Sequence, residues 1–157
     1  HGDALYRRSL YTFWKRTAPA PAMAIFDAPS REFSCTVRPR SDTPLQALAL
    51  MNDVQHIEAA RAFAAQLLDQ PAANDAARLV HAFRAATART PTREEQTLLA
   101  ATLAKHRARF TADPESAKKV LTNGESAAPA NLSPAELAAW TLLANLLLNL
   151  DETINRS

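Results

Sequence analysis

Apolar residues recur at helical spacing along most of the chain, interrupted by polar positions and by short stretches without a period. The segment 53–69, for example, has one apolar face formed by Val54, Ile57, Ala60, Ala64 and Leu67. Segments of this kind cover residues 5–16, 43–51, 53–69, 75–89, 92–110, 114–123 and 133–150. The pattern therefore predicts an all-α protein, an irregular helical bundle of about six or seven helices.

Helix-capping side chains stand at the predicted starts. Thr92 and Glu95 have the spacing of a capping box, in which each side chain accepts a hydrogen bond from the other residue's backbone N–H. The remaining predicted caps are Thr43 with Gln46, Asp53, Asn74 or Asp75, and Ser133 with Glu136. These signals divide the pattern into separate helices, with Gly124 as a stop after 114–123.

The segment 133–150 is the most apolar in the chain. Its large apolar side chains cover more than one face: Trp140, Leu143, Leu146, Leu147 and Leu150. We therefore predict that it is the central helix of a bundle over residues 43–157, within a single helical domain, 1–157.

The first 42 residues have a different pattern. Leu10, Phe13 and Trp14 stand at helical spacing and two prolines follow, so we predict a helix over residues 1–16. Residues 17–42 hold no period, although apolar residues are interleaved with polar ones. This favours a long ordered N-terminal loop lying across the helices.

Composition agrees with a helical fold. The chain has 34 Ala and 20 Leu, the best helix formers, against 7 Val and Ile together, and aromatic residues make up 6%. We therefore do not expect a β-sandwich or a β-barrel. With only 2 Gly, the chain also lacks the glycine-rich loops that bind nucleotide phosphates.

Charge is distributed unevenly. Residues 1–40 contain seven Lys or Arg and three acidic residues, whereas residues 41–157 contain eleven basic and thirteen acidic residues. The basic end indicates either an anionic partner or arginines that pair with acidic groups on the helical part. Neither a basic recognition helix nor RNA-reading aromatic residues stand out, so we predict no nucleic-acid partner.

Side chains that could bind an anion or move a proton lie in the N-terminal loop. The anion-binding candidates are Arg31, Arg38 and Arg40, because a guanidinium binds sulfate, phosphate or carboxylate with two parallel hydrogen bonds. The catalytic candidates are Asp27, Glu32 and Cys35, with a carboxylate as general base. Each also has a structural interpretation: a turn-forming Asp, an Arg–Glu pair that fixes the loop, and a small buried Cys.

Other chemistry is not predicted for this chain. The lone Cys35 excludes an internal disulfide, a Cys-rich zinc site and a haem attachment motif. His56, His81 and His106 stand 25 residues apart, but no pair has metal-binding spacing. We therefore predict no metal and no cofactor in the chain. We also predict no membrane span, because the longest apolar stretch, 137–150, is too short.

Several motifs carry a family resemblance. They are RRSLYTFWKRT at 7–17, FDAPSRE at 26–32, CTVR at 35–38, TPLQAL at 43–48, RTPTREE at 89–95, GES at 124–126 and ANLLLNLDE at 144–152. In this order the chain resembles the C-terminal domain of unknown function of large exported proteins first recognised in planctomycetes, which often contain a cytochrome c module.

The resemblance implies an exported or periplasmic protein in which this chain is the carboxyl-terminal part of a larger domain. It implies other domains of the same polypeptide as partners, haem c in another module, and a redox partner or polysaccharide. The chain departs from the family pattern at one place. Arg38-Pro-Arg40 interrupts a usual arginine pair, and Asp42 replaces a usual Asn, which puts any chemistry of this loop in doubt.

Two functions follow from these observations. The first is a non-catalytic helical module that acts in interaction or assembly within an exported, cytochrome c-linked bacterial protein. The alternative is part of an enzyme site on the arginine-rich loop 26–53, acting on anionic or sulfated polysaccharide. Arginines that converge on a pocket beside Asp27 or Glu32 would favour the enzyme.

Overall fold

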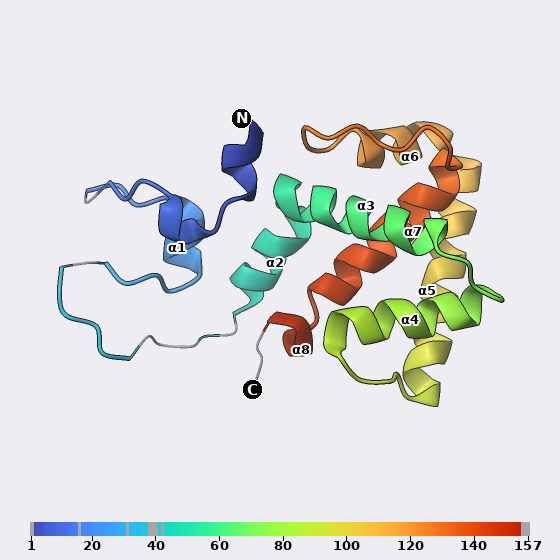
Figure 1. The fold of residues 1–157 in the computed structure, drawn as a ribbon, viewed down its shortest axis with the longest axis horizontal. Coiled ribbons are helices and arrows are strands. Elements are labelled where there is room, and N and C mark those ends of the chain that lie inside the picture. Colours follow the sequence, from blue (N-terminus) through green and yellow to red (C-terminus); the bar gives the residue numbers. More distant parts are fainter. Residues whose placement is uncertain (1, 16, 31, 38–40, 42, 155–157) are drawn as a thin grey trace. The chain divides into compact units, whose positions relative to one another are not determined.

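The structure is a computed structural model that describes residues 2–15, 17–30, 32–37, 41 and 43–154. Over these residues helices are the only regular secondary structure, so the predicted all-α fold is confirmed. Contacts divide the chain into two compact units, which we call unit 1 (residues 1–52) and unit 2 (residues 53–157). Figure 1 traces both units.

Unit 2 is a helical bundle. Its helices are α3 (Val54–Asp69), α4 (Asp75–Thr87), α5 (Arg93–Ala112), α6 (Pro114–Leu121), α7 (Pro134–Leu148) and α8 (Asp151–Ile154). Helix α7 contacts each of the other five, as predicted for the central helix (Figure 1). Trp140, Leu143 and Leu147 on α7 are buried, and they form the core with leucines, alanines and phenylalanines of α3, α4, α5 and α6. The bundle thus owes its stability mainly to apolar burial around one helix.

Most predicted caps are confirmed in unit 2. Asp53 and Asn74 each accept a hydrogen bond from a backbone N–H in the first turn, and Thr92 with Glu95 forms the complete capping box. Asp113, which the sequence pattern did not predict as a cap, accepts the N–H of Ser116 in the same way. Ser133 is the exception, since its side chain makes no capping hydrogen bond. The Glu136 carboxylate, which a capping box would direct back to the Ser133 N–H, binds Arg107 and Trp140 instead.

The C-terminal helix is shorter than predicted. Helix α7 ends at Leu148 rather than at residue 150, because Asn149 leaves helical geometry with φ −101° and ψ 8°. The separate helix α8 follows, which the sequence pattern did not predict.

Unit 1 contains two 3₁₀ helices, η1 (Gly2–Tyr6) and η2 (Ser9–Tyr11), and the helices α1 (Pro21–Ile25) and α2 (Pro44–Asn52). Helices α1 and α2 contact each other. Among the described residues of this unit, only Gln46 and Leu50 are buried. Helix α2, predicted as the first helix of the bundle, belongs to unit 1.

The predicted helix over residues 1–16 is wrong. Arg8 and Thr12 have extended backbone geometry on either side of η2, and Leu10 and Phe13 are 74% and 85% exposed. A short amphipathic helix is marginal unless its apolar face packs against something, and here it does not. The loop predicted over 17–42 contains helix α1, because Pro21 is well suited to the first position of a helix.

Candidate functional site

The predicted site residues all fall in unit 1. Asp27, Glu32 and Cys35 lie in the described part of the chain, whereas Arg31, Arg38 and Arg40 lie outside the described residues. Their role as anion-binding residues therefore stays a prediction.

Asp27 joins the end of α1 to the start of α2. It has a left-handed backbone conformation, with φ +52°, directly after α1. Its Oδ2 accepts a hydrogen bond from the hydroxyl of Ser41. Ser41 Oγ in turn accepts one from Gln46 Nε2, at 2.8 Å, and the same amide donates to the carbonyl of Ile25, at 2.8 Å. The turn-forming interpretation of Asp27 agrees with this geometry.

Gln46 is the residue that completes this network. Besides its amide bonds, its Oε1 accepts from Thr43 N at 3.0 Å, and its own N–H donates to Thr43 Oγ1 at 3.3 Å. This is the capping box predicted at the start of α2. The sequence therefore identified Gln46 as the residue that completes the Thr43 capping box. Its link through Ser41, five residues away, to Asp27, nineteen residues away, left no local signal.

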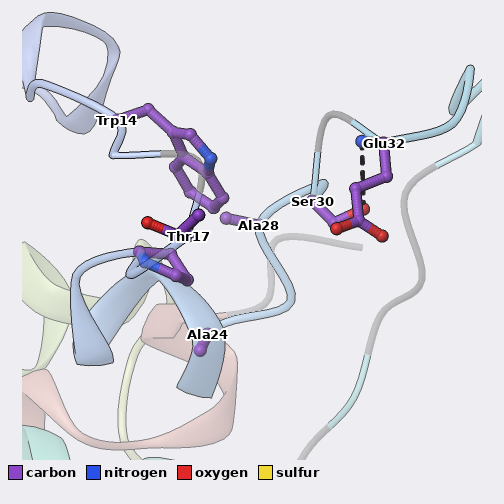
Figure 2. A pocket seen from close by; sticks show the side chains of 7 residues that line it. Trp14, Thr17, Ala24, Ala28, Ser30 and Glu32 are labelled. Atoms are coloured by element: carbon purple, nitrogen blue, oxygen red, sulfur yellow. Dashed lines mark hydrogen bonds between the residues drawn. The ribbon is translucent and has the colours of Figure 1, made fainter.

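A pocket of about 520 Å³ lies around α1. It is lined by Trp14, Thr17, Pro19, Ala24, Ala28, Ser30 and Glu32. Figure 2 shows the indole of Trp14 near Thr17 and Ala28, with Ser30 and Glu32 further along the loop that follows α1. The Glu32 N–H donates to Ser30 Oγ at 3.4 Å. One predicted catalytic candidate therefore lines a pocket, together with a tryptophan that sequence reasoning assigned only to a helix face.

Cys35 is exposed, and its thiol donates to the carbonyl of Val37 at 3.2 Å. The interpretation as a small buried hydrophobe is therefore wrong. The physical reason is that residues 32–37 are all exposed, so this part of the loop provides no apolar surroundings for the thiol.

Arg61 is the most deeply buried cation among the described residues, with 2% of its surface exposed. From α3 it donates to the carbonyls of Leu121, Asn123 and Ser126, the last two at 2.6 Å, and to Ser126 Oγ at 2.9 Å. The last carbonyl group of α6 and two carbonyl groups of the loop after it thereby receive hydrogen bonds. Arg61 is thus a structural residue that holds the 121–126 loop against α3.

Glu58 binds the same loop through backbone N–H groups. Its carboxylate accepts the N–H groups of Glu125 and Ser126, at 3.2 and 2.6 Å, and lies 3.7 Å from Arg61 Nη2. Sequence reasoning missed this pair. The available signal was the presence of two charged residues, one helical turn apart, among the buried positions of α3.

Two further arginines connect helices of unit 2. Arg89 binds Glu95 and Glu152 with two hydrogen bonds each, and its guanidinium lies 4.8 Å from the ring of Phe83. The hydrogen bonds from Arg89 lower the pKa of Glu95 from its usual 4.5 to about 2. This cluster fixes α8 to the start of α5.

Arg107 connects α4, α5 and α7 through the carboxylates of Asp75 and Glu136. Its hydrogen bond lowers the pKa of Asp75. The indole N–H of Trp140 donates to the same Glu136, at 2.8 Å. These charges of unit 2 are therefore paired for structural reasons, which leaves the pocket of unit 1 as the candidate site.

In the part of the chain that the structure describes, no three His, Cys, Asp or Glu side chains gather in a way that could hold a metal ion. None of its helices is long and apolar enough to cross a membrane.

Residues 1–103 match the family model of PSD1, a protein of unknown function (DUF1553). The chain belongs to the PSD1 family. The match covers all of unit 1, including every predicted site residue, and extends through α3 and α4 into α5. The resemblance to a domain of unknown function is therefore confirmed. No curated protein and no solved structure matches the chain.

Proposed function

We propose that the chain is a helical interaction module whose unit 1 binds another folded part of the polypeptide to which it belongs. The supporting observation is a contrast within unit 1. Among its described residues one apolar side chain, Leu50, is buried, whereas nine large apolar side chains are exposed. These are Tyr6, Leu10, Tyr11, Phe13, Phe33, Val37, Leu45, Leu48 and Met51.

This contrast has an energetic consequence. Burial of one large apolar side chain stabilises a protein by about 1.5–3 kcal/mol, and a segment of this size needs a core or a partner to remain folded. Unit 1 has almost no core of its own. Nine exposed large apolar side chains in a segment with so little core favour a surface that another folded part covers. In the described part of unit 2, by comparison, large apolar side chains are exposed at only three positions, Val54, Leu98 and Ile154.

The biological setting is part of the same proposal. The family resemblance carried by the sequence motifs implies an exported or periplasmic protein, and this is the setting of the proposal. In this setting the partner of unit 1 is another domain of the same polypeptide. Haem c belongs to a separate cytochrome c module, and a redox partner acts on that module rather than on this chain.

Photo-crosslinking in the longer polypeptide tests the interaction. The photoreactive residue p-benzoylphenylalanine replaces Phe13 in one variant and Phe33 in another, and Leu98, 67% exposed on α5, serves as the matched control. We expect cross-links from positions 13 and 33 to residues outside 1–157, identified by mass spectrometry, and none from position 98. If positions 13 and 33 react with no residue outside the chain, the proposal is wrong.

An enzyme site on the loop 26–53 is the second candidate, supported by the pocket with Glu32 in its wall. Asp27 or Glu32 would act as general base or Cys35 as nucleophile, while Arg31, Arg38 and Arg40 would bind sulfate groups of a polysaccharide. Incubation with sulfated and desulfated polysaccharide, followed by assays for new reducing ends and free sulfate, tests it. Activity that Asp27→Asn, Glu32→Gln and Cys35→Ser all leave unchanged would exclude this site.

A further inference from the structure

The pocket around α1 combines an aromatic ring with a carboxylate. Trp14 is half-buried in its wall, and Glu32 is the one charged side chain among the described residues that line it. The rest of the described lining is small, with the hydroxyls of Thr17 and Ser30 among proline and alanine side chains (Figure 2). This arrangement differs from the anion site that the sequence predicts for the same loop.

We infer that this pocket binds an organic cation, an alkylammonium or guanidinium group, between Trp14 and Glu32. The face of an indole carries partial negative charge and attracts cations. A carboxylate adds a charge-assisted hydrogen bond, and hydroxyl oxygens accept further N–H groups. The apolar part of the wall suits the methylene groups that carry such a cation.

Unit 2 contains the same residue types with their cations in place. The guanidinium of Arg78 lies 5.8 Å from the ring centroid of Trp140, and the indole N–H of Trp140 donates to Glu136. Glu136 also binds the guanidinium of Arg107. A tryptophan and a glutamate thus already bind guanidinium groups within this chain. In unit 1 a tryptophan and a glutamate line a pocket whose volume, about 520 Å³, accommodates a ligand larger than a guanidinium.

Two sources could supply the cation, a free amine or a Lys or Arg side chain on a protein partner. A Lys or Arg side chain as the source rests on the proposed interaction function, whereas a free amine does not. A free alkylammonium therefore tests the pocket by itself, and a peptide that carries the same group tests the link to a partner.

Nuclear magnetic resonance of the longer polypeptide provides the measurement, with labelled tryptophan incorporated site-specifically at position 14 in one sample and at position 140 in another. We expect n-butylammonium chloride to shift the Trp14 signal in a saturable way, with a millimolar Kd, and to leave the Trp140 signal unchanged. Sodium chloride, n-butanol and methyl glucoside at equal concentration should not reproduce the shift. The variant Glu32→Gln should weaken binding about fivefold or more, and the control Glu94→Gln should bind as the parent chain does.

The inference is wrong if n-butylammonium leaves the Trp14 signal in place or if Glu32→Gln binds as tightly as the parent chain. It is also wrong if methyl glucoside gives the same saturable shift, which would identify a neutral sugar as the ligand. A lysine peptide that binds more tightly than n-butylammonium, and that loses binding when its lysine is acetylated, would support a protein source. Binding of n-butylammonium without cross-links from unit 1 would overturn the proposed function but would still support the inference that the pocket binds a cation.

Discussion

Gly124 lies directly against Glu58. A Cβ atom at Gly124 would be 2.8 Å from the Cβ of Glu58 and closer still to its carboxylate, and the backbone has φ +88°. Glu58 cannot turn away without losing its hydrogen bonds from the N–H groups of Glu125 and Ser126. This loop therefore requires glycine both for its backbone conformation and for the space that Glu58 occupies.

The variant Gly124→Ala should lower the free energy of unfolding by about 1–3 kcal/mol, because it adds both strain and a steric conflict. Urea unfolding followed by circular dichroism measures the change. Gly2→Ala is the matched control, since Gly2 also has a positive φ, +67°, but no atom lies within 4 Å of the added Cβ. An equal or larger loss in Gly2→Ala would contradict the steric argument.

Removal of the buried Arg61 side chain should lower the free energy of unfolding by more than Gly124→Ala does. Arg61→Met leaves the carboxylate of Glu58 without its adjacent cation and leaves buried carbonyl groups without donors, so we expect a loss of about 3–5 kcal/mol in the free energy of unfolding. Arg93→Met, at the exposed start of α5, should change it by less than about 0.5 kcal/mol. The double variant Glu58→Gln, Arg61→Met should lose less than the sum of the single losses. Additive losses would show that the two residues act independently.

The two capping-box motifs of unit 2 should respond differently to substitution. Thr92→Ala removes a side chain that accepts the N–H of Glu95 at 3.2 Å, so we expect a loss of about 1 kcal/mol. Ser133 makes no such bond, so Ser133→Ala should cost less than about 0.5 kcal/mol. Thermal and urea unfolding of the two variants compares them directly. Equal losses would indicate that Ser133 caps α7 in solution.

The comparison of these motifs shows what sequence patterns can predict. Thr43, Asp53 and Thr92 were predicted as caps and are caps, because capping depends on residues three apart. Ser133 has the same spacing to Glu136, but its side chain makes no capping hydrogen bond, and the Glu136 carboxylate that would complete the box binds Arg107 and Trp140. Arg107 is twenty-nine residues away in sequence, so no local pattern could reveal this competition.

The difference between local and long-range interactions also explains why the candidate site was predicted only in part. Glu32 was predicted from its residue type and lines a pocket, whereas Trp14 was assigned to a helix that did not form. Helical spacing predicts a helix only where a partner surface buries the apolar face, and Phe13 remains exposed. The buried pair Glu58 and Arg61 was missed because its partners lie in a loop more than sixty residues away.

Arg89 and its two carboxylates lead to a pH-dependent prediction. Because hydrogen bonds from Arg89 lower the pKa of Glu95 to about 2 in the folded protein, below its usual 4.5, the ionised carboxylate favours folding. Hydrogen bonds from the same guanidinium lower the pKa of Glu152. For a carboxylate whose folded pKa is depressed, the stabilisation is complete above the unfolded pKa and decreases as the pH falls toward the folded pKa.

The variant Glu95→Gln should therefore flatten the acid side of the stability profile. We expect the free energy of unfolding of the parent chain to fall between pH 4.5 and pH 2, and to fall less steeply in Glu95→Gln, because the variant has no carboxylate to protonate at this site. Urea unfolding at a series of pH values across this window measures both slopes. Glu94→Gln, a neighbouring exposed position on α5, is the matched control and should keep the parent slope. The same slope in Glu95→Gln and in the parent chain would show that Arg89 does not hold Glu95 ionised.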